Sequence, residues 1–160
     1  MIIRIIGRSA TVLVVGFLLG WMARNSDVVE AQGRTPFIVT RIFTGADGQA
    51  RSEQVEIKLT PGKTQATGAS IDSSDPVAVS QIQVLRTPPG YVAEWHPVGR
   101  RHYVVMVSGR REIEVAEGKK ISFAPGSVML VEDVTGKGHF TRGVGTEDAI
   151  SLVIPIADSK

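Results

Sequence analysis

The sequence predicts an all-β fold, a single antiparallel β-barrel or jelly roll. From residue 37 onward, about ten short segments are rich in β-branched and aromatic residues and alternate polar with apolar positions, as half-buried strands do. Glycine, proline or aspartate separates nearly every pair of segments, and this regular spacing is typical of sandwiches and barrels. We find no convincing helical pattern in this part, and 160 residues suffice for one domain with its own core.

The expected strands follow one another along the chain with short turns between them. The first two cover residues 37–44 and 53–59, joined through the turn sequence GADGQ. A connection rich in Thr, Ser, Gly and Pro comes next, over residues 60–76. Further strands are expected at 77–86, 90–96, 102–108, 111–117, 120–124, 127–133, 138–144 and 149–156. We therefore divide the chain into an N-terminal segment (1–31), N-terminal strands with a flexible connection (32–74) and a barrel core (75–156).

The N-terminal segment has the features of an export signal. Arg4 and Arg8 precede an uncharged apolar run over residues 10–23, and a small-residue site ends at Ala31. Cleavage after Ala31 would give a periplasmic or secreted protein. The alternative is an uncleaved signal anchor helix, which would make this segment the only contact with a membrane. The apolar run is short for a span, which needs roughly 17 to 25 residues.

Composition excludes several classes of function. Of the 18 basic and 16 acidic residues, three and two lie in the first 31 positions, leaving a nearly neutral remainder of 15 and 14. No basic stripe with interleaved aromatics is present, so we expect no nucleic-acid partner. The chain has no cysteine, which excludes disulfides, thiol catalysis, cysteine-based metal sites and a lipid-modified N-terminal cysteine.

The three histidines all lie in the second half of the chain. Residues two apart on a strand share a face, so Glu94 and His96 are expected to project together. Hairpin pairing would place His102 opposite or diagonal to His96, and His139 would come from a neighbouring strand of the same sheet. Three converging neutral imidazoles suit Zn, Fe, Mn, Ni or Cu. The alternative is that these histidines are hydrogen-bonded polar residues at strand ends.

The segment GYVAEWHPVGRRHYVVMVSG resembles the first motif of the cupin superfamily, G-x5-H-x-H-x3-E-x6-G. Gly90, His96 and Gly109 match it in register, whereas Val98 replaces the second histidine and His102 replaces the glutamate. The second motif is looser in FAPGSVMLVEDVTGKGH, where Gly126 matches and His139 arrives two residues late. In addition, Glu132 takes the proline position.

The resemblance implies a small single-domain cupin barrel over roughly residues 75–156. It places His96 and His139 at metal-ligand positions and His102 at a third with changed chemistry. Val98 leaves a fourth position without a ligand, so Glu94 is considered as a substitute carboxylate or, alternatively, as a surface charge. The implied cofactor is a divalent metal ion, with Fe, Mn, Zn, Ni and Cu not distinguished.

Glu132 and Asp133 are the candidates for a catalytic carboxylate. One of them could hold the second nitrogen of an imidazole or act as a general base; the alternative is a pair of solvent-facing turn acids. We expect an exported cupin-like protein that binds a small molecule at a divalent metal, with the reaction unassigned. A metal-free binding barrel, or a structural barrel that forms a homodimer, is the alternative.

Overall fold

The computed structural model describes residues 34–157. The chain divides into residues 1–35 and 36–160, and the fold is that of the second part. The predicted signal or anchor helix over residues 1–31 lies outside the described residues. In the part that is described, no helix has the length and apolar character needed to cross a membrane.

Twelve strands and one short 3-10 helix (Ala116–Gly118) make up the described residues. The strands are β1 (Phe37–Thr44), β2 (Ala50–Ile57), β3 (Thr60–Pro61), β4 (Asp72–Ser73), β5 (Gln83–Thr87), β6 (Val92–His96), β7 (His102–Ser108), β8 (Arg111–Glu114), β9 (Lys120–Phe123), β10 (Val128–Glu132), β11 (His139–Gly143) and β12 (Ala149–Pro155). The expected all-β class is confirmed for this part of the chain.

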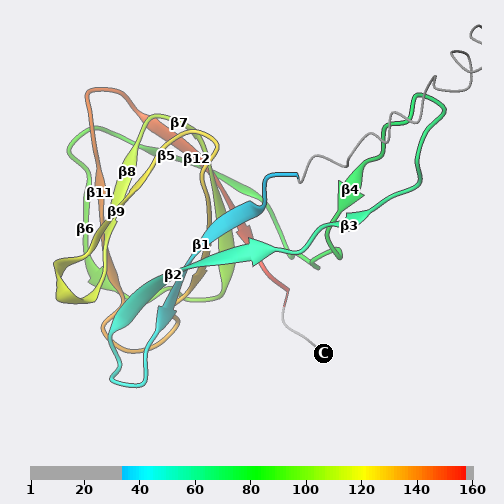
Figure 1. Ribbon diagram of the computed structural model, residues 1–160. Coiled ribbons are helices and arrows are strands. Elements are labelled where there is room, and N and C mark those ends of the chain that lie inside the picture. Colours follow the sequence, from blue (N-terminus) through cyan, green and yellow to red (C-terminus); the bar gives the residue numbers. More distant parts are fainter. Residues whose placement is uncertain (1–33, 158–160) are drawn as a thin grey trace, which may run out of the picture. The chain divides into compact units, whose positions relative to one another are not determined.

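Two sheets surround one interior (Figure 1). The larger sheet has the order β2-β1-β10-β7-β12-β5, and the smaller has the order β6-β11-β8-β9. Within residues 34–157, β3 and β4 pair only with each other. Consecutive strands therefore alternate between the sheets at several points, as in a jelly roll.

One strand pair departs from the antiparallel pattern that the sequence predicts. β1 runs parallel to β10, with Thr40 opposite Met129 and Phe43 opposite Glu132, while all other pairs of named strands are antiparallel. Antiparallel neighbours can be joined by a hairpin, but β1 and β10 are far apart along the chain, so no hairpin imposes a direction on them. The larger sheet is therefore mixed.

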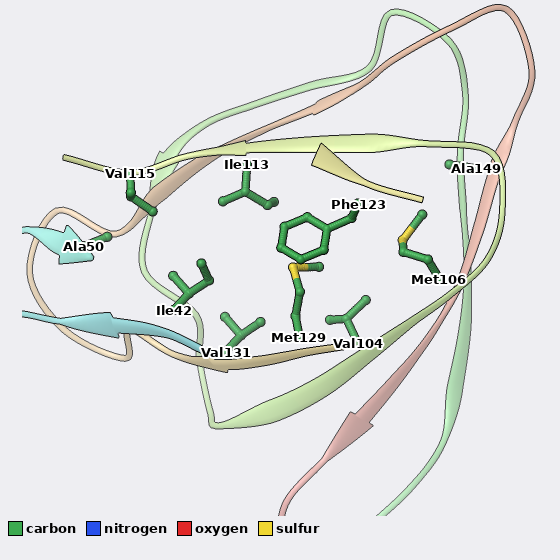
Figure 2. Close-up of a cluster of buried hydrophobic side chains, with 10 residues drawn as sticks. All are labelled: Ile42, Ala50, Val104, Met106, Ile113, Val115, Phe123, Met129, Val131 and Ala149. Atoms are coloured by element: carbon green, nitrogen blue, oxygen red, sulfur yellow. The ribbon is translucent and has the colours of Figure 1, made fainter. Parts of the chain in front are cut away.

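The hydrophobic core lies between the two sheets (Figure 2). Alternating residues of β7 and β10 point inward from the larger sheet, among them Val104, Met106 and Met129. Phe123, at the end of β9, is 1% exposed and is one of the largest fully buried side chains. Val98, Ile121 and Val153 pack against the edge of this cluster.

Phe123→Ala is expected to lower the free energy of unfolding by about 3 to 5 kcal/mol, because it removes apolar contacts and leaves a cavity. Val84→Ala is the control, since Val84 is 65% exposed on β5 and its truncation should cost less than about 0.5 kcal/mol. Urea unfolding measures both. Equal losses for the two variants would contradict the assignment of the core.

Candidate metal centre

His96 and His139 lie side by side in the smaller sheet. His96 ends β6 and His139 begins β11, and the two are partners in the antiparallel register. Their ring centroids are 4.9 Å apart, with the rings inclined at 51°. The expectation that His139 comes from a strand next to that of His96 is therefore confirmed.

A β-bulge in β6 decides which side chains face the interior. His139 is opposite His96 but Thr141 is opposite Ala93, so two steps along β11 correspond to three along β6. Ala93 and His96 consequently both line the interior cavity. Glu94 is exposed and does not line it, so the expected shared face of Glu94 and His96 is wrong, because strict alternation fails at a bulge.

His102 reaches the same cavity from the opposite sheet. It begins β7, which pairs with β10 and β12 and not with β6. The expected hairpin between the strands of His96 and His102 is therefore wrong. The segment between them contains Pro97, which has no backbone N–H for a ladder, and the chain crosses to the other sheet there.

The cavity has a volume of about 370 Å³, and all three histidines line it. Its walls are otherwise mainly apolar, with Ile42, Val104 and Met129 among them. Predominantly apolar walls with a few polar groups are typical of small-molecule sites. Arg111 also lines this cavity.

Each histidine is oriented by a hydrogen bond from its Nδ1 atom. His96 Nδ1 lies 2.7 Å from the carbonyl oxygen of Glu94, and His102 Nδ1 lies 2.9 Å from that of Arg100. Carbonyl oxygens only accept, so these Nδ1 atoms carry the proton. In a neutral imidazole this leaves the Nε2 lone pair free, the form in which histidine binds metals.

Asp133 performs the same function for His139. Its Oδ2 lies 2.7 Å from His139 Nδ1, and both side chains are buried, Asp133 completely. Of the two roles considered for a carboxylate at this position, holding the second ring nitrogen is the one that the geometry provides. Asp133 Oδ1 has no hydrogen-bond partner among the described residues.

Burial lowers the pKa of His102, and the hydrogen bond to Arg100 opposes that effect only in part. The neutral imidazole is therefore favoured near neutral pH, and a neutral ring is required for metal ligation. His139 contributes to the lowered pKa through charge repulsion, and Asp133 acts in the opposite direction.

Glu132 has a different environment from Asp133. It is the last residue of β10, where alternation turns it away from the cavity, and it forms ion pairs with Arg41 and Arg101. Burial opposes its ionisation, but the hydrogen bonds from Arg41 and Arg101 outweigh burial and hold the pKa of Glu132 below its ordinary value. Glu132 therefore serves as an ion-pair centre between strands.

Gly138 allows β11 to approach β6. Its φ is +71°, and a Cβ atom there would lie 1.9 Å from the carbonyl oxygen of His96. No larger residue fits this approach without moving the backbone that carries His96. His139, the partner of His96, is the residue that follows Gly138.

Arg111 is a cavity residue that was not among the site residues predicted from the sequence. The segment REIEV could have identified it, because strand alternation puts Arg111 on the same face as Ile113 and Val115. Both of those residues are buried in the core.

The donor set fits a metal ion in its chemistry, since it offers three imidazoles with oriented Nδ1 atoms. Across residues 34–157, however, no group of three His, Asp or Glu side chains already stands in metal-binding geometry. Closing such a site therefore requires movement of at least one of the three rings.

No family model matches this chain, and no curated protein matches it. Among solved structures it is similar to a cupin-like protein from Thermotoga maritima, with 14% identity and a TM-score of 0.41 over 48% of this chain and 56% of that one. A Cupin 2 conserved barrel domain protein from Salinispora arenicola has 19% identity and a TM-score of 0.38, over 48% and 62% of the two chains.

A conserved protein of unknown function from Streptococcus pyogenes has 19% identity and a TM-score of 0.40, over 49% of this chain and 65% of that one. In each of these three matches the chain covers less than two thirds of the other protein. The structural neighbours thus include proteins named for the cupin fold that the two motifs resemble. They carry no argument about ligand, metal or activity, which has to come from the residues of the site.

Gly138→Ala is expected to disrupt the pairing of His96 with His139, because the added methyl group would overlap the His96 carbonyl. Two-dimensional NMR of the histidine rings measures the effect, as loss or large shift of the contacts between these two imidazoles. Gly99→Ala is the control, since nothing lies within 4 Å of a Cβ atom there. Unchanged ring contacts in Gly138→Ala would contradict the close approach.

Glu132→Gln is expected to lower the free energy of unfolding at pH 7 by about 1 to 3 kcal/mol, because it removes the negative charge between Arg41 and Arg101 and replaces one of the two acceptor oxygens with an NH2 donor. The lowered pKa of Glu132 means that this contribution is complete above the ordinary carboxyl pKa and is lost as the pH falls through the folded-state value. The difference between parent and variant should therefore shrink below about pH 4. Denaturant unfolding across pH tests this, with exposed Glu56→Gln as control.

Proposed function

We propose that this protein binds a divalent metal ion through the Nε2 atoms of His96, His102 and His139 and uses the site to bind a small molecule. The observation that carries the proposal is that all three Nδ1 atoms have an acceptor. Random surface histidines have no reason to share one tautomer and one cavity. In metal sites, the ring nitrogen of histidine that does not bind the metal usually donates a hydrogen bond, which fixes the orientation and the tautomer of the ring.

The three side chains have distinct roles in the proposal. His96 and His139 form a pair within one sheet, and His102 supplies the third ligand from the other sheet. Asp133 is a positioning residue that acts through His139, since its Oδ2 accepts the hydrogen bond from Nδ1 and leaves Nε2 for the metal. Glu94 is exposed and is not included in the ligand set.

A bound metal would supply Lewis-acid polarisation of an oxygen on the small molecule. The chain's own residues orient the imidazoles, and the apolar walls exclude water from the ligand. Imidazole ligands suit Fe, Mn, Zn, Ni and Cu alike, and the reaction is left unassigned. As part of this proposal, the N-terminal segment 1–31 exports the protein or anchors it in a membrane.

A metal-free binding barrel is the second candidate function. It is favoured by the finding that, in the described part of the chain, no three donors are already arranged around a metal position. In that case the same Nε2 atoms would accept hydrogen bonds from the ligand directly.

Metal content measured on tag-free protein separates the two candidates. After incubation with each metal and removal of the excess, the parent is expected to retain about one equivalent per chain, and the His96→Ala/His139→Ala double variant almost none. Glu94→Gln is the matched control and should retain metal as the parent does. His102→Ala should weaken retention by tenfold or more, about 1.4 kcal/mol.

The cobalt(II) absorption spectrum provides an independent readout, because its intensity depends on the coordination of the ion. We expect a spectrum in the parent and in Glu94→Gln and its loss in the double histidine variant. Equal, negligible metal content in parent and double variant would refute the metal proposal and leave the metal-free barrel.

A further inference from the structure

The cavity wall contains a buried cation to which no other residue of the described chain supplies a carboxylate. Arg111 begins β8 and is 8% exposed. Within residues 34–157, no carboxylate forms an ion pair with it, and its Nε atom has no hydrogen-bond partner. Five other arginines of the described residues, all more exposed, do have carboxylate partners: Arg41, Arg51, Arg86, Arg101 and Arg142.

This arrangement is unfavourable for the protein by itself. Burial lowers the pKa of Arg111, and the electrostatic interaction with Tyr91 opposes that effect only in part. A guanidinium nevertheless keeps its proton in proteins. A buried charge that is neither paired nor hydrogen-bonded destabilises the folded protein. A negatively charged ligand in the cavity would neutralise Arg111 and remove that cost.

We infer that Arg111 binds the carboxylate group of a small monoanionic ligand in this cavity. The inference rests on the proposed function only in taking this cavity as the ligand site. The planar guanidinium matches a carboxylate through two parallel hydrogen bonds. The other arginine of the cavity wall, Arg86, is 73% exposed and faces Asp148 at 3.6 Å, so one unpaired positive charge is available and a single negative charge balances it.

Arg111, which would hold the carboxylate of the ligand, lies at a distance from the histidines along the barrel. Arg111 is the register partner of Gly143 at the end of β11, whereas His139 begins that strand. Four residues of strand correspond to about 13 Å between these backbone positions. A ligand held by Arg111 would thus extend from its carboxylate along the apolar wall, and the carboxylate need not contact a metal.

Calorimetric titration of the EDTA-treated full chain tests the inference, with acetate, propionate and benzoate as probes and acetamide, propionamide and benzamide as neutral counterparts. At least one acid is expected to bind about tenfold or more tightly than its own amide, a difference of about 1.4 kcal/mol. Arg111→Gln should abolish that preference. Arg110→Gln, which removes an exposed charge from the adjacent residue, should keep it. Inorganic phosphate is titrated alongside.

Three results would overturn the inference: no preference for any acid over its amide in the parent, an unchanged preference in Arg111→Gln, or phosphate bound more tightly than every acid. If Arg111→Gln does not fold, Arg111→Met serves, because it keeps the bulk and removes the unpaired charge. The acid bound by the parent should raise the Tm of the parent and of Arg110→Gln but not that of Arg111→Met. An equal rise in Arg111→Met would also refute the assignment.

The same samples keep this inference distinct from the metal proposal. A preference for acids in metal-free protein that depends on Arg111 supports the anion site whether or not a metal binds elsewhere in the cavity. A preference that appears only after metal is added and persists in Arg111→Gln would assign the anion to the metal. That outcome refutes the role of Arg111 and leaves the metal proposal standing.

Discussion

The site depends on one close backbone approach, that of Gly138 to the carbonyl of His96. Only a residue without a Cβ allows β11 to lie so near β6, and the same pairing contains the bulge that turns both Ala93 and His96 inward. The carbonyl of Glu94, held by this bulge, then accepts a hydrogen bond from the Nδ1–H group of His96. Backbone geometry therefore fixes the position of the pair and the tautomer of one of its rings.

The second constraint is electrostatic. Asp133 is completely buried, and its only side-chain partner among the described residues is His139, at 2.7 Å. Hydrogen bonding lowers the cost of burying a carboxylate, and here one oxygen is bonded to His139 Nδ1 while the other has no hydrogen-bond partner among the described residues.

Strand alternation and turn residues were enough to predict the all-β class and the adjacency of the strands of His96 and His139. They were not enough to place His102, because alternation does not say whether consecutive strands pair or cross to opposite sheets. Here β6 pairs with β11, while β7 pairs with β10 and β12. Glu94 was misplaced for a related reason, since a bulge adds one residue and reverses the expected face. Both errors come from non-local pairing, which no short segment of sequence encodes.

Arg111 fits the alternation of inward and outward positions on its strand, yet it places a charged side chain at a buried position. On β8 it occupies the inward position of an alternation that continues with Ile113 and Val115, where an apolar residue would stabilise the core. Polar or charged residues at positions where the pattern favours apolar ones occur mainly at functional sites. The cavity thus combines a polar end, where imidazoles present lone pairs, with a cationic position farther along β11. A ligand that bound to both positions would need an electron-pair acceptor or a metal at the histidines and a negative charge at Arg111. A neutral apolar molecule would interact favourably with neither position.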